Sequence, residues 1–357
     1  MTVELPREFL ELTKDDGQSS GSTAAAAALV QKIMQNDAPV EITSLKGGIT
    51  NELLLAEQDG IKMLVRAFGR GTGSFIDRQR EFAVHQQLQT LGLAPTLYGK
   101  FGNGLVYGFI PGSAAEPSQL GEPTVMRQVS RRLAQWHATL SPRTVAAQLP
   151  NGLDEFWTVL GKWVDLCPEG VLPLSNTELR DEFARVRAQL GAAHSPQVMG
   201  HCDLLSANIL LPNDSHDGCL PSVPHGTDPH IASRIASDVA FIDYEYAIPC
   251  PRAFDIANHF QEWQGYECDK SRVPEPSTSS PQIRAWCTEY LTAYGLLVGN
   301  EQALNQLVAE LQLFWGMPGF YWGVWSAIQS HSSAIDFGYA DYAANRFQEY
   351  LDWKARS

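Results

Sequence analysis

The sequence predicts an α+β protein of two lobes: a small N-terminal lobe of antiparallel sheet with helices, and a larger, mainly helical C-terminal lobe. Three observations lead to this prediction. The chain has 357 residues, which is more than one small hydrophobic core requires. Short apolar runs bounded by turn residues occupy the N-terminal part of the chain. Beyond about residue 110, apolar residues recur mainly at helical spacing.

The N-terminal lobe is expected to cover residues 22–110, after an N-terminal arm at residues 1–21. Within the lobe, Ser22 or Thr23 is expected to cap an alanine-rich helix that extends to Met34. The small, polar side chains of serine and threonine are favourable at this position because they accept a hydrogen bond from the first helical turn. The lobe is therefore predicted to begin with a helix.

Strand candidates follow this helix. The runs 51–57 and 61–68 are separated by Asp59-Gly60, and an Asp-Gly pair between apolar runs is typical of a β-hairpin. Residues 76–91 contain no glycine or proline and are predicted to form a helix. The remaining expected strands are 41–45 and 105–110.

The C-terminal lobe is expected to cover residues 111–357. Pro123 is a favourable first-turn residue, and five apolar residues recur at helical spacing after it, namely Val125, Val129, Leu133, Trp136 and Leu140. Further helices are expected at 176–191, 281–295, 301–315 and 341–354. The segment 212–238 is rich in Pro, Ser, Asp, His and Gly, which predicts an exposed, flexible insertion.

The composition limits the partners. The chain carries 26 basic and 40 acidic residues, a net charge of −14, which disfavours nucleic acid and anionic membranes and favours a cationic substrate. The longest apolar run, 313–325, is too short to span a bilayer. Six scattered cysteines without paired CxxC spacing indicate the reduced thiols of a cytoplasmic protein rather than a disulfide framework or a zinc site.

The strongest functional signal is the segment 198–211, VMGHCDLLSANILL, which contains His-x-Asp-x-x-x-x-Asn. Kinase catalytic loops have this spacing, so Asp203 is predicted to orient the substrate hydroxyl or accept its proton, and Asn208 to bind magnesium. A second apolar run ends in Asp243, which is placed like the second magnesium-binding aspartate of kinases. A lone His-x-Asp is common in structural loops, but the second aspartate makes that alternative the weaker one.

Candidate phosphate-binding residues lie in the N-terminal lobe. The segment 45–51, LKGGITN, is glycine-rich, and glycines let backbone N–H groups approach the phosphates of ATP. A plain hairpin turn is the alternative for this segment. Arg66 ends a predicted buried strand, where its guanidinium can bind phosphate oxygens, and Glu81 is its expected ion-pair partner. The candidates within the segment are Gly47, Gly48, Thr50 and Asn51.

The segment 105–110, LVYGFI, is the expected hinge between the lobes. Backbone groups of a hinge strand can bind the edge of an adenine ring, which makes Tyr107 and Phe109 candidates for nucleotide binding. This expectation depends on the order of the segments along the chain and not on the side chains.

Aromatic and acidic residues of the C-terminal lobe suit an alkylammonium ion. Such an ion needs ring faces for cation–π attraction and a carboxylate for its charge. Glu262 and Tyr266 lie near one another in the sequence, and Trp322 and Trp325 share a helical face. Aromatic residues at this helical spacing are also common in a hydrophobic core, which is the alternative for Trp322 and Trp325. Asp255 and His259 are expected to stabilise the catalytic loop.

Several segments together resemble the choline/ethanolamine kinase family: GGITN, HCDLLSANILL, FIDYEYA, RAFDIANHFQEW and FGYADYAANRF. They occur in family order between about residues 45 and 350. The resemblance implies a protein-kinase-like fold, ATP and Mg²⁺ as cofactors, and an amino-alcohol substrate. It also implies a homodimer. This chain departs from the family pattern at Cys202, where asparagine is usual, and at Ala257, where glycine is usual.

The resemblance also implies roles for individual residues. Asp203 matches the catalytic base, and Asn208 and Asp243 match the magnesium ligands. Arg66 and Glu81 match the pair that positions the phosphates. The substrate-binding candidates are Glu245, Glu262, Tyr266, Trp322, Trp325, Phe337 and Tyr342.

Three further segments resemble ethanolamine kinases more than choline kinases, namely DRQRE at 77–81, APTLY at 94–98 and FGNGL at 101–105. The expected reaction is therefore phosphorylation of ethanolamine, the first step of phosphatidylethanolamine synthesis by the CDP-ethanolamine route. A choline kinase or a dual enzyme is one alternative, and an aminoglycoside phosphotransferase is another. An inactive kinase-like binding protein is disfavoured because every charged group that phosphoryl transfer needs is present.

Overall fold

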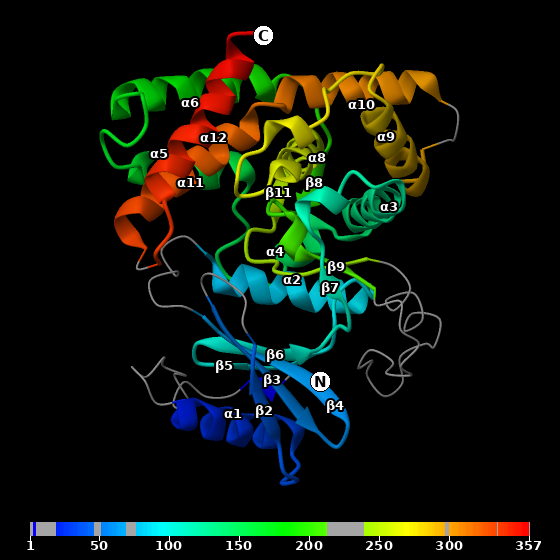
Figure 1. Cartoon of the computed structure of the whole chain (residues 1–357), viewed down its shortest axis with the longest axis vertical. Coiled ribbons are helices and arrows are strands. Elements are labelled where there is room, and N and C mark those ends of the chain that lie inside the picture. Colours follow the sequence, from blue (N-terminus) through cyan, green and yellow to red (C-terminus); the bar gives the residue numbers. More distant parts are fainter. Residues whose placement is uncertain are drawn as a thin grey trace. The chain divides into compact units, whose positions relative to one another are not determined.

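The structure is a computed structural model, and it describes residues 3–4, 19–45, 51–68, 76–212, 239–296, 300–333 and 335–356 (Figure 1). The chain divides into two compact units. The sheet unit takes its described residues from Met1–Ser74, Leu88–Ser113 and Pro212–Ala240. The helical unit takes its described residues from Phe75–Gln87, Ala114–Leu211 and Phe241–Ser357.

The sheet unit contains a six-stranded sheet in the order β1-β5-β6-β4-β3-β2 (Figure 1). All neighbouring strands are antiparallel except β1 and β5, which are parallel. Helix α1 covers the sheet, because its apolar residues Ala26, Leu29, Val30 and Ile33 share one core with residues of β3 and β4. The strands are β1 (Val3–Glu4), β2 (Glu41–Ser44), β3 (Asn51–Gln58), β4 (Ile61–Phe68), β5 (Leu97–Phe101) and β6 (Gly104–Gly108).

The hairpin predicted at Asp59-Gly60 is present between β3 and β4. Gln58 pairs with Ile61, and both turn residues have positive φ, 51° for Asp59 and 78° for Gly60. Two positive φ values in a two-residue turn match the twist of the flanking strands. The sequence therefore specifies this turn locally.

The N-terminal residues differ from the expectation. Helix α1 spans Ser19–Met34, so Ser22 and Thr23 lie inside the helix and do not cap it. The expected arm contributes strand β1, whose Val3 pairs with Gly99. The two compact units also do not coincide with a division at residue 110, because the first part of α2 belongs to the helical unit. The boundaries of the lobes stay a prediction.

The helical unit is built mainly from long helices (Figure 1). The predictions of helices near 176–191, 281–295, 301–315 and 341–354 are confirmed by α6, α9, α10 and α12. The helices are α2 (Arg78–Thr90), α3 (Pro123–Thr139), α4 (Pro142–Ala146), α5 (Phe156–Leu166), α6 (Asn176–Gly191), α8 (Arg252–Gln261), α9 (Pro281–Ala293), α10 (Glu301–Phe314), α11 (Met317–Ser332) and α12 (Tyr339–Lys354). None of the helices within the described ranges has the length and apolar character that a membrane crossing needs.

Two small sheets frame the catalytic-loop sequence. Strands β8 (Gln197–Gly200) and β11 (Ile248–Pro251) form an antiparallel pair. A second sheet has the strand order β10-β9-β7, with β10 at Ala240–Phe241, β9 at Ile209–Leu211 and β7 at Ser113–Ala114. The residues between β8 and β9 therefore have a paired strand on each side.

Helices α11 and α12 lie side by side because glycines of α11 leave room for the backbone of α12 (Figure 1). A Cβ atom added at Gly319 would lie 2.5 Å from the carbonyl oxygen of Arg346 and 2.9 Å from the backbone nitrogen of Tyr350. A Cβ atom added at Gly323 would lie 3.0 Å from the Cβ atom of Phe347. The glycines set the distance between the two helices.

We expect Gly319→Ala to lower the free energy of unfolding by about 1–3 kcal/mol, the usual range for overpacking, although alanine favours helix by about 1 kcal/mol. The matched control is Gly191→Ala at the end of α6, where an added Cβ meets nothing within 4 Å. Denaturant unfolding of the two variants measures the difference. Equal stability of the two variants would contradict the close approach of α11 and α12.

Candidate active site

The catalytic loop connects β8 to β9 and carries Asp203 and Asn208. The Nδ2 atom of Asn208 donates to the carbonyl oxygen of Asp203 at 2.8 Å and to its Oδ2 atom at 3.0 Å. The carbonyl oxygen of Asn208 accepts from the backbone N–H of Ile242 at 3.0 Å. The structure thus brings Asp203 and Asn208 into contact and places Asn208 beside the segment that leads to Asp243.

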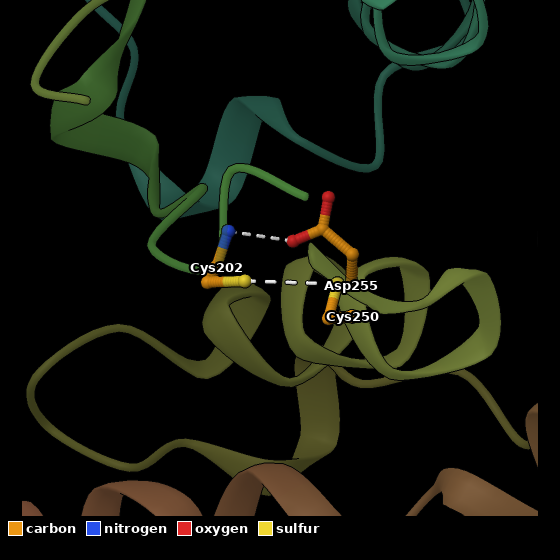
Figure 2. Close-up of side chains that lie close together, drawn as sticks. All are labelled: Cys202, Cys250 and Asp255. Atoms are coloured by element: carbon orange, nitrogen blue, oxygen red, sulfur yellow. Dashed lines mark hydrogen bonds between the residues drawn. The ribbon is translucent and has the colours of Figure 1, made fainter. Parts of the chain in front are cut away.

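The carboxylate of Asp255, in the first turn of α8, holds the start of this loop (Figure 2). Its Oδ1 atom accepts from the backbone N–H of Cys202 at 2.6 Å, and its Oδ2 atom accepts from the backbone N–H of His201 at 3.0 Å. The Nε2 atom of His137 lies 2.8 Å from the same Oδ2. Burial opposes the charged form, but the bonds from His137 and the backbone outweigh it and lower the pKa of Asp255.

The departure from the family pattern at Cys202 leaves this arrangement intact. The backbone N–H of Cys202 bonds Asp255, while its side chain points toward Cys250 with 3.7 Å between the sulfur atoms (Figure 2). The three side chains are close enough to share a metal ion. However, burial raises the pKa of both thiols, and three donors already use the oxygens of Asp255. Neutral thiols are poor ligands, so these residues do not fit a metal site.

His259, one turn after Asp255 on α8, holds the other side of the loop. Its Nδ1 atom donates to the carbonyl oxygen of Leu204 at 3.1 Å, and its Nε2 atom accepts from the indole N–H of Trp263 at 3.2 Å. Burial lowers the pKa of His259 to about 4, which agrees with a neutral ring. Asp255 and His259 therefore hold the backbone on both sides of Asp203, as the sequence predicted.

Acidic side chains are concentrated around Asp203. Burial raises the pKa of Asp203 well above its usual value, and nearby negative charges add to this effect. These charges belong to Asp243, Glu262 and Glu245. Asp203 is thus a buried carboxyl group in a strongly electronegative environment.

Two of these acidic side chains, Asp243 and Glu245, also lie close to Glu81. Carboxylate oxygens of Glu81, Asp243 and Glu245 lie within 4.8 Å of one another. The Nη1 atom of Arg78 donates to Glu81 at 2.7 Å and to Glu245 at 2.9 Å, so α2 is bonded to the segment that contains Asp243. Arg78 was not a sequence candidate, although its spacing of three from Glu81 on a helix is a recognisable signal.

The donor set fits a magnesium ion. Asn208 uses its Nδ2 atom for Asp203, which leaves its Oδ1 atom for a ligand, and Asp243 supplies a carboxylate. Asp243 has a φ of 65°, in the left-handed region, so the chain turns sharply at this residue. Magnesium prefers oxygen ligands of these two kinds.

One group of aromatic rings lies along α11. Trp322 and Trp325 lie edge to face, 5.5 Å apart, and each ring is fixed by its indole N–H. The N–H of Trp322 donates to Oδ1 of Asn258 at 2.8 Å, and that of Trp325 donates to the hydroxyl of Tyr246 at 3.0 Å. Tyr246 directly follows Glu245 and was missed in the sequence analysis, although an aromatic residue beside that acidic segment could have marked it.

A second group of rings includes Tyr266, Phe337 and Tyr342, with ring centres 5.6–6.3 Å apart. Tyr266 is 53% exposed, so this group reaches the surface. Desolvation and the negative charges of Asp203 and Glu262 raise the pKa of Tyr266. The two groups are continuous, because Tyr339 contacts both Trp325 and Phe337.

The nucleotide-binding candidates belong mostly to the sheet unit. Arg66 is a buried residue of the central strand β4, opposite Leu105 of β6. The backbone N–H of Phe109 donates to the carbonyl oxygen of Lys62, so this group is used within the sheet unit. Tyr107 pairs with Leu64. The pairing of Arg66 with Glu81 joins residues of different units and stays a prediction.

The glycine-rich candidates Gly47, Gly48 and Thr50 lie outside the described residues. Asn51 is the first residue of β3, and its backbone pairs with that of Phe68. The prediction that these four residues bind phosphates is therefore neither supported nor opposed by the geometry.

The sheet, the helical unit and the Asp203–Asn208 loop define a protein-kinase-like phosphotransferase fold. An ethanolamine kinase of Plasmodium vivax superposes with a TM-score of 0.77 at 24% identity, covering 96% of this chain and 90% of that one. A choline kinase of Cryptosporidium parvum superposes with a TM-score of 0.69 at 18% identity, covering 94% of this chain and 96% of that one.

The sequence comparisons identify the family. The profile of the choline/ethanolamine kinase family matches residues 42–351. Ethanolamine kinase 1 of Homo sapiens is 30% identical over 371 residues, covering 98% of this chain and 75% of the human protein. The chain therefore belongs to the choline/ethanolamine kinase family, which confirms the resemblance found in the sequence. By this membership it is a kinase that binds a nucleotide.

His259 is expected to make stability depend on pH. The pKa of His259 is about 4 in the folded protein and 6.5 in the unfolded chain. As the pH falls below 6.5, the unfolded chain therefore binds more protons than the folded protein, and the free energy of unfolding falls. The loss reaches about 1 kcal/mol at pH 5.5. His259→Asn retains a donor for Leu204 but does not titrate, so its stability should fall less between pH 7.5 and 5.5. Equal losses in urea unfolding of the variant and the wild type would contradict a neutral, buried His259.

Proposed function

We propose that this protein is an ethanolamine kinase, which transfers the γ-phosphate of ATP to the hydroxyl of ethanolamine and yields phosphoethanolamine and ADP. The reaction would be the first step of phosphatidylethanolamine synthesis by the CDP-ethanolamine route, in the cytoplasm. The observation that carries the proposal is the geometry of the loop: Asn208 bonds the Asp203 carboxylate, which lies among the negative charges of Asp243, Glu245 and Glu262. The rings of Tyr246 and Tyr266 are near enough to feel the charge of Asp203. Such a site favours a small cationic alcohol. Curated relatives of this chain are ethanolamine kinases.

Asp203 would orient the hydroxyl of ethanolamine and accept its proton while the hydroxyl oxygen bonds to the γ-phosphorus and the bond to ADP breaks. A raised pKa makes a carboxylate a better proton acceptor near neutral pH. The Nδ2 atom of Asn208 fixes the carboxylate through its bond to Oδ2. Because phosphoryl transfer demands positioning more than covalent chemistry, this fixed orientation is the main contribution of the loop.

Asn208, through Oδ1, and Asp243 would hold magnesium, which when bound neutralises phosphate charge. The hydrogen bond from Ile242 to Asn208 supports this assignment because it keeps the two ligands on neighbouring segments. On the nucleotide, Arg66 would pair with phosphate oxygens and Glu81 would position that arginine. The remaining proposed contacts to ATP come from Gly47, Gly48, Thr50, Asn51, Tyr107 and Phe109.

The ammonium end of the substrate would lie against Glu262 and the two groups of rings. A primary ammonium has three N–H donors, so it gains from a carboxylate as well as from ring faces. The substrate contacts that we propose are Glu245, Glu262, Tyr266, Trp322, Trp325, Phe337 and Tyr342. Choline is the second candidate substrate, because the ring cluster of Trp322, Trp325 and Tyr246 also suits a quaternary ammonium. A homodimer is a further prediction, drawn from the resemblance to the family.

The proposal is tested by ADP release from the purified protein with ATP and magnesium, in the presence of ethanolamine, choline or no acceptor. We expect kcat/KM for ethanolamine to exceed that for choline by about tenfold, about 1.4 kcal/mol of transition-state binding. Preference for choline would keep the reaction and overturn the substrate. A folded protein that binds ATP and phosphorylates neither alcohol would instead be an inactive kinase-like binding protein.

A further inference from the structure

We infer that Arg346, on α12, is a positioning residue of the amino-alcohol site, which fixes Glu262 and Tyr342 in the orientation that receives the ammonium group. The inference rests on the proposed function, since it assigns a task in substrate binding. Arg346 was not a candidate in the sequence, and it does not itself need to touch the substrate.

Arg346 is completely buried and makes polar contacts with three side chains. Its Nη1 atom donates to Oε1 of Glu262 at 2.8 Å and to the hydroxyl of Tyr342 at 3.0 Å. Its Nε atom lies 3.1 Å from a carboxylate oxygen of Glu349. Burying a guanidinium is unfavourable unless partners compensate it, and here Nη1 makes both hydrogen bonds, Nε makes only the ion pair, and Nη2 has no hydrogen-bond partner among the described residues. The position of Arg346 therefore depends on Glu262 and Tyr342.

The contact with Glu262 leaves one carboxylate oxygen for a ligand. Oε1 accepts from Arg346, whereas Oε2 has no hydrogen-bond partner among the residues that the structure describes. The carboxylate is planar, so holding Oε1 in place also sets the direction of Oε2. An acceptor that is already oriented loses less conformational entropy when it binds a donor such as an ammonium N–H.

The same Nη1 atom of Arg346 also bonds the hydroxyl of Tyr342, one of the aromatic rings of the site. The guanidinium carbon lies 5.7 Å from the centre of the Tyr342 ring, and Tyr342 contacts Phe337 and Tyr266. One cation therefore fixes both the carboxylate and the rings that an ammonium ion needs.

The backbone that carries Arg346 is closely packed against α11. A Cβ atom added at Gly319 of α11 would lie 2.5 Å from the carbonyl oxygen of Arg346. Helix α12 therefore lies directly against α11 at this residue. Helix α11 also carries Trp322 and Trp325. The position of Arg346 is thus tied to the helix that presents the other group of rings.

A purely structural role is the competing explanation, and the helical unit contains a matched pair for comparison. Arg252 is also buried and donates to both carboxylate oxygens of Glu310, at 2.8 and 2.9 Å. Among the described residues, the other side-chain partners of this pair are Ser195 and Tyr294, neither of which is a candidate substrate residue. Loss of Arg252 therefore shows what removing a buried arginine from the helical unit does when Glu262 and Tyr342 keep their own partner.

The test compares Arg346→Met with Arg252→Met. We expect both to lower the midpoint of thermal unfolding. Only Arg346→Met should raise the KM for ethanolamine, by about tenfold or more, because a carboxylate that loses its buried partner also loses its orientation. The KM for ATP should stay within about twofold, and kcat should change less than KM. Calorimetric titration with ethanolamine gives the same comparison without turnover.

A double-mutant cycle shows whether Arg346 acts through Glu262. If it does, Glu262→Gln alone weakens ethanolamine binding, and adding Arg346→Met weakens it little further. Additive effects in the cycle, or an unchanged KM in folded Arg346→Met, would overturn the inference. If Arg346→Met does not fold, Arg346→Lys provides the test, because lysine keeps the positive charge but cannot reach all three partners. We expect this variant to raise the KM for ethanolamine by about threefold. An unchanged KM would overturn the inference.

The two proposals fail in different ways. A wild-type protein that phosphorylates no ethanolamine contradicts the proposed function. A wild-type protein that is active, combined with an unchanged KM in the Arg346 variants, contradicts only the positioning role.

Discussion

The carboxylate of Asp255 accepts hydrogen bonds from two successive backbone N–H groups of the catalytic loop and from the ring of His137. A buried charge is tolerated only when donors of this kind compensate it, so the loop and helix α8 are fixed as one unit. The same helix continues to His259, which holds the loop again, and is followed directly by Glu262. One helix therefore positions both the residue that would receive the hydroxyl proton and the carboxylate that would receive the ammonium group.

The site is electronegative because several carboxylates lie close together, and two arginines neutralise part of this negative charge. Arg78 bonds Glu81 and Glu245, whereas Arg346 bonds Glu262. Burial raises the pKa of Asp203, and the negative charges of Asp243, Glu262 and Glu245 add to this effect. A cation bound among these carboxylates would reduce the repulsion. The arrangement thus suits two positively charged ligands, a divalent ion and an amino alcohol, and it fits the negative charge of the whole chain.

Features set by neighbouring residues could be predicted from the sequence, and features set by distant ones could not. The Asp59-Gly60 turn, the long helices and the His-x-Asp loop each depend on a short local pattern. Strand β5 was missed because it follows a proline and contains a glycine, and its pairing with β6 decides its structure. The bounds of α11 were obscured by residues such as Gly319, whose place in a helix is explained only by its contact with α12. Arg346 was missed because its partner Glu262 is 84 residues away.

The central claim is that Asp203 acts on the hydroxyl of ethanolamine, and Asp203→Asn tests it most directly because the amide keeps the shape of the side chain but accepts a proton poorly. The measurement is the rate of phosphoethanolamine formation in a single turnover, followed together with the binding of ATP and ethanolamine. The account predicts that the rate falls by about 10²-fold or more while both ligands still bind. A variant that forms phosphoethanolamine at the wild-type rate would contradict it.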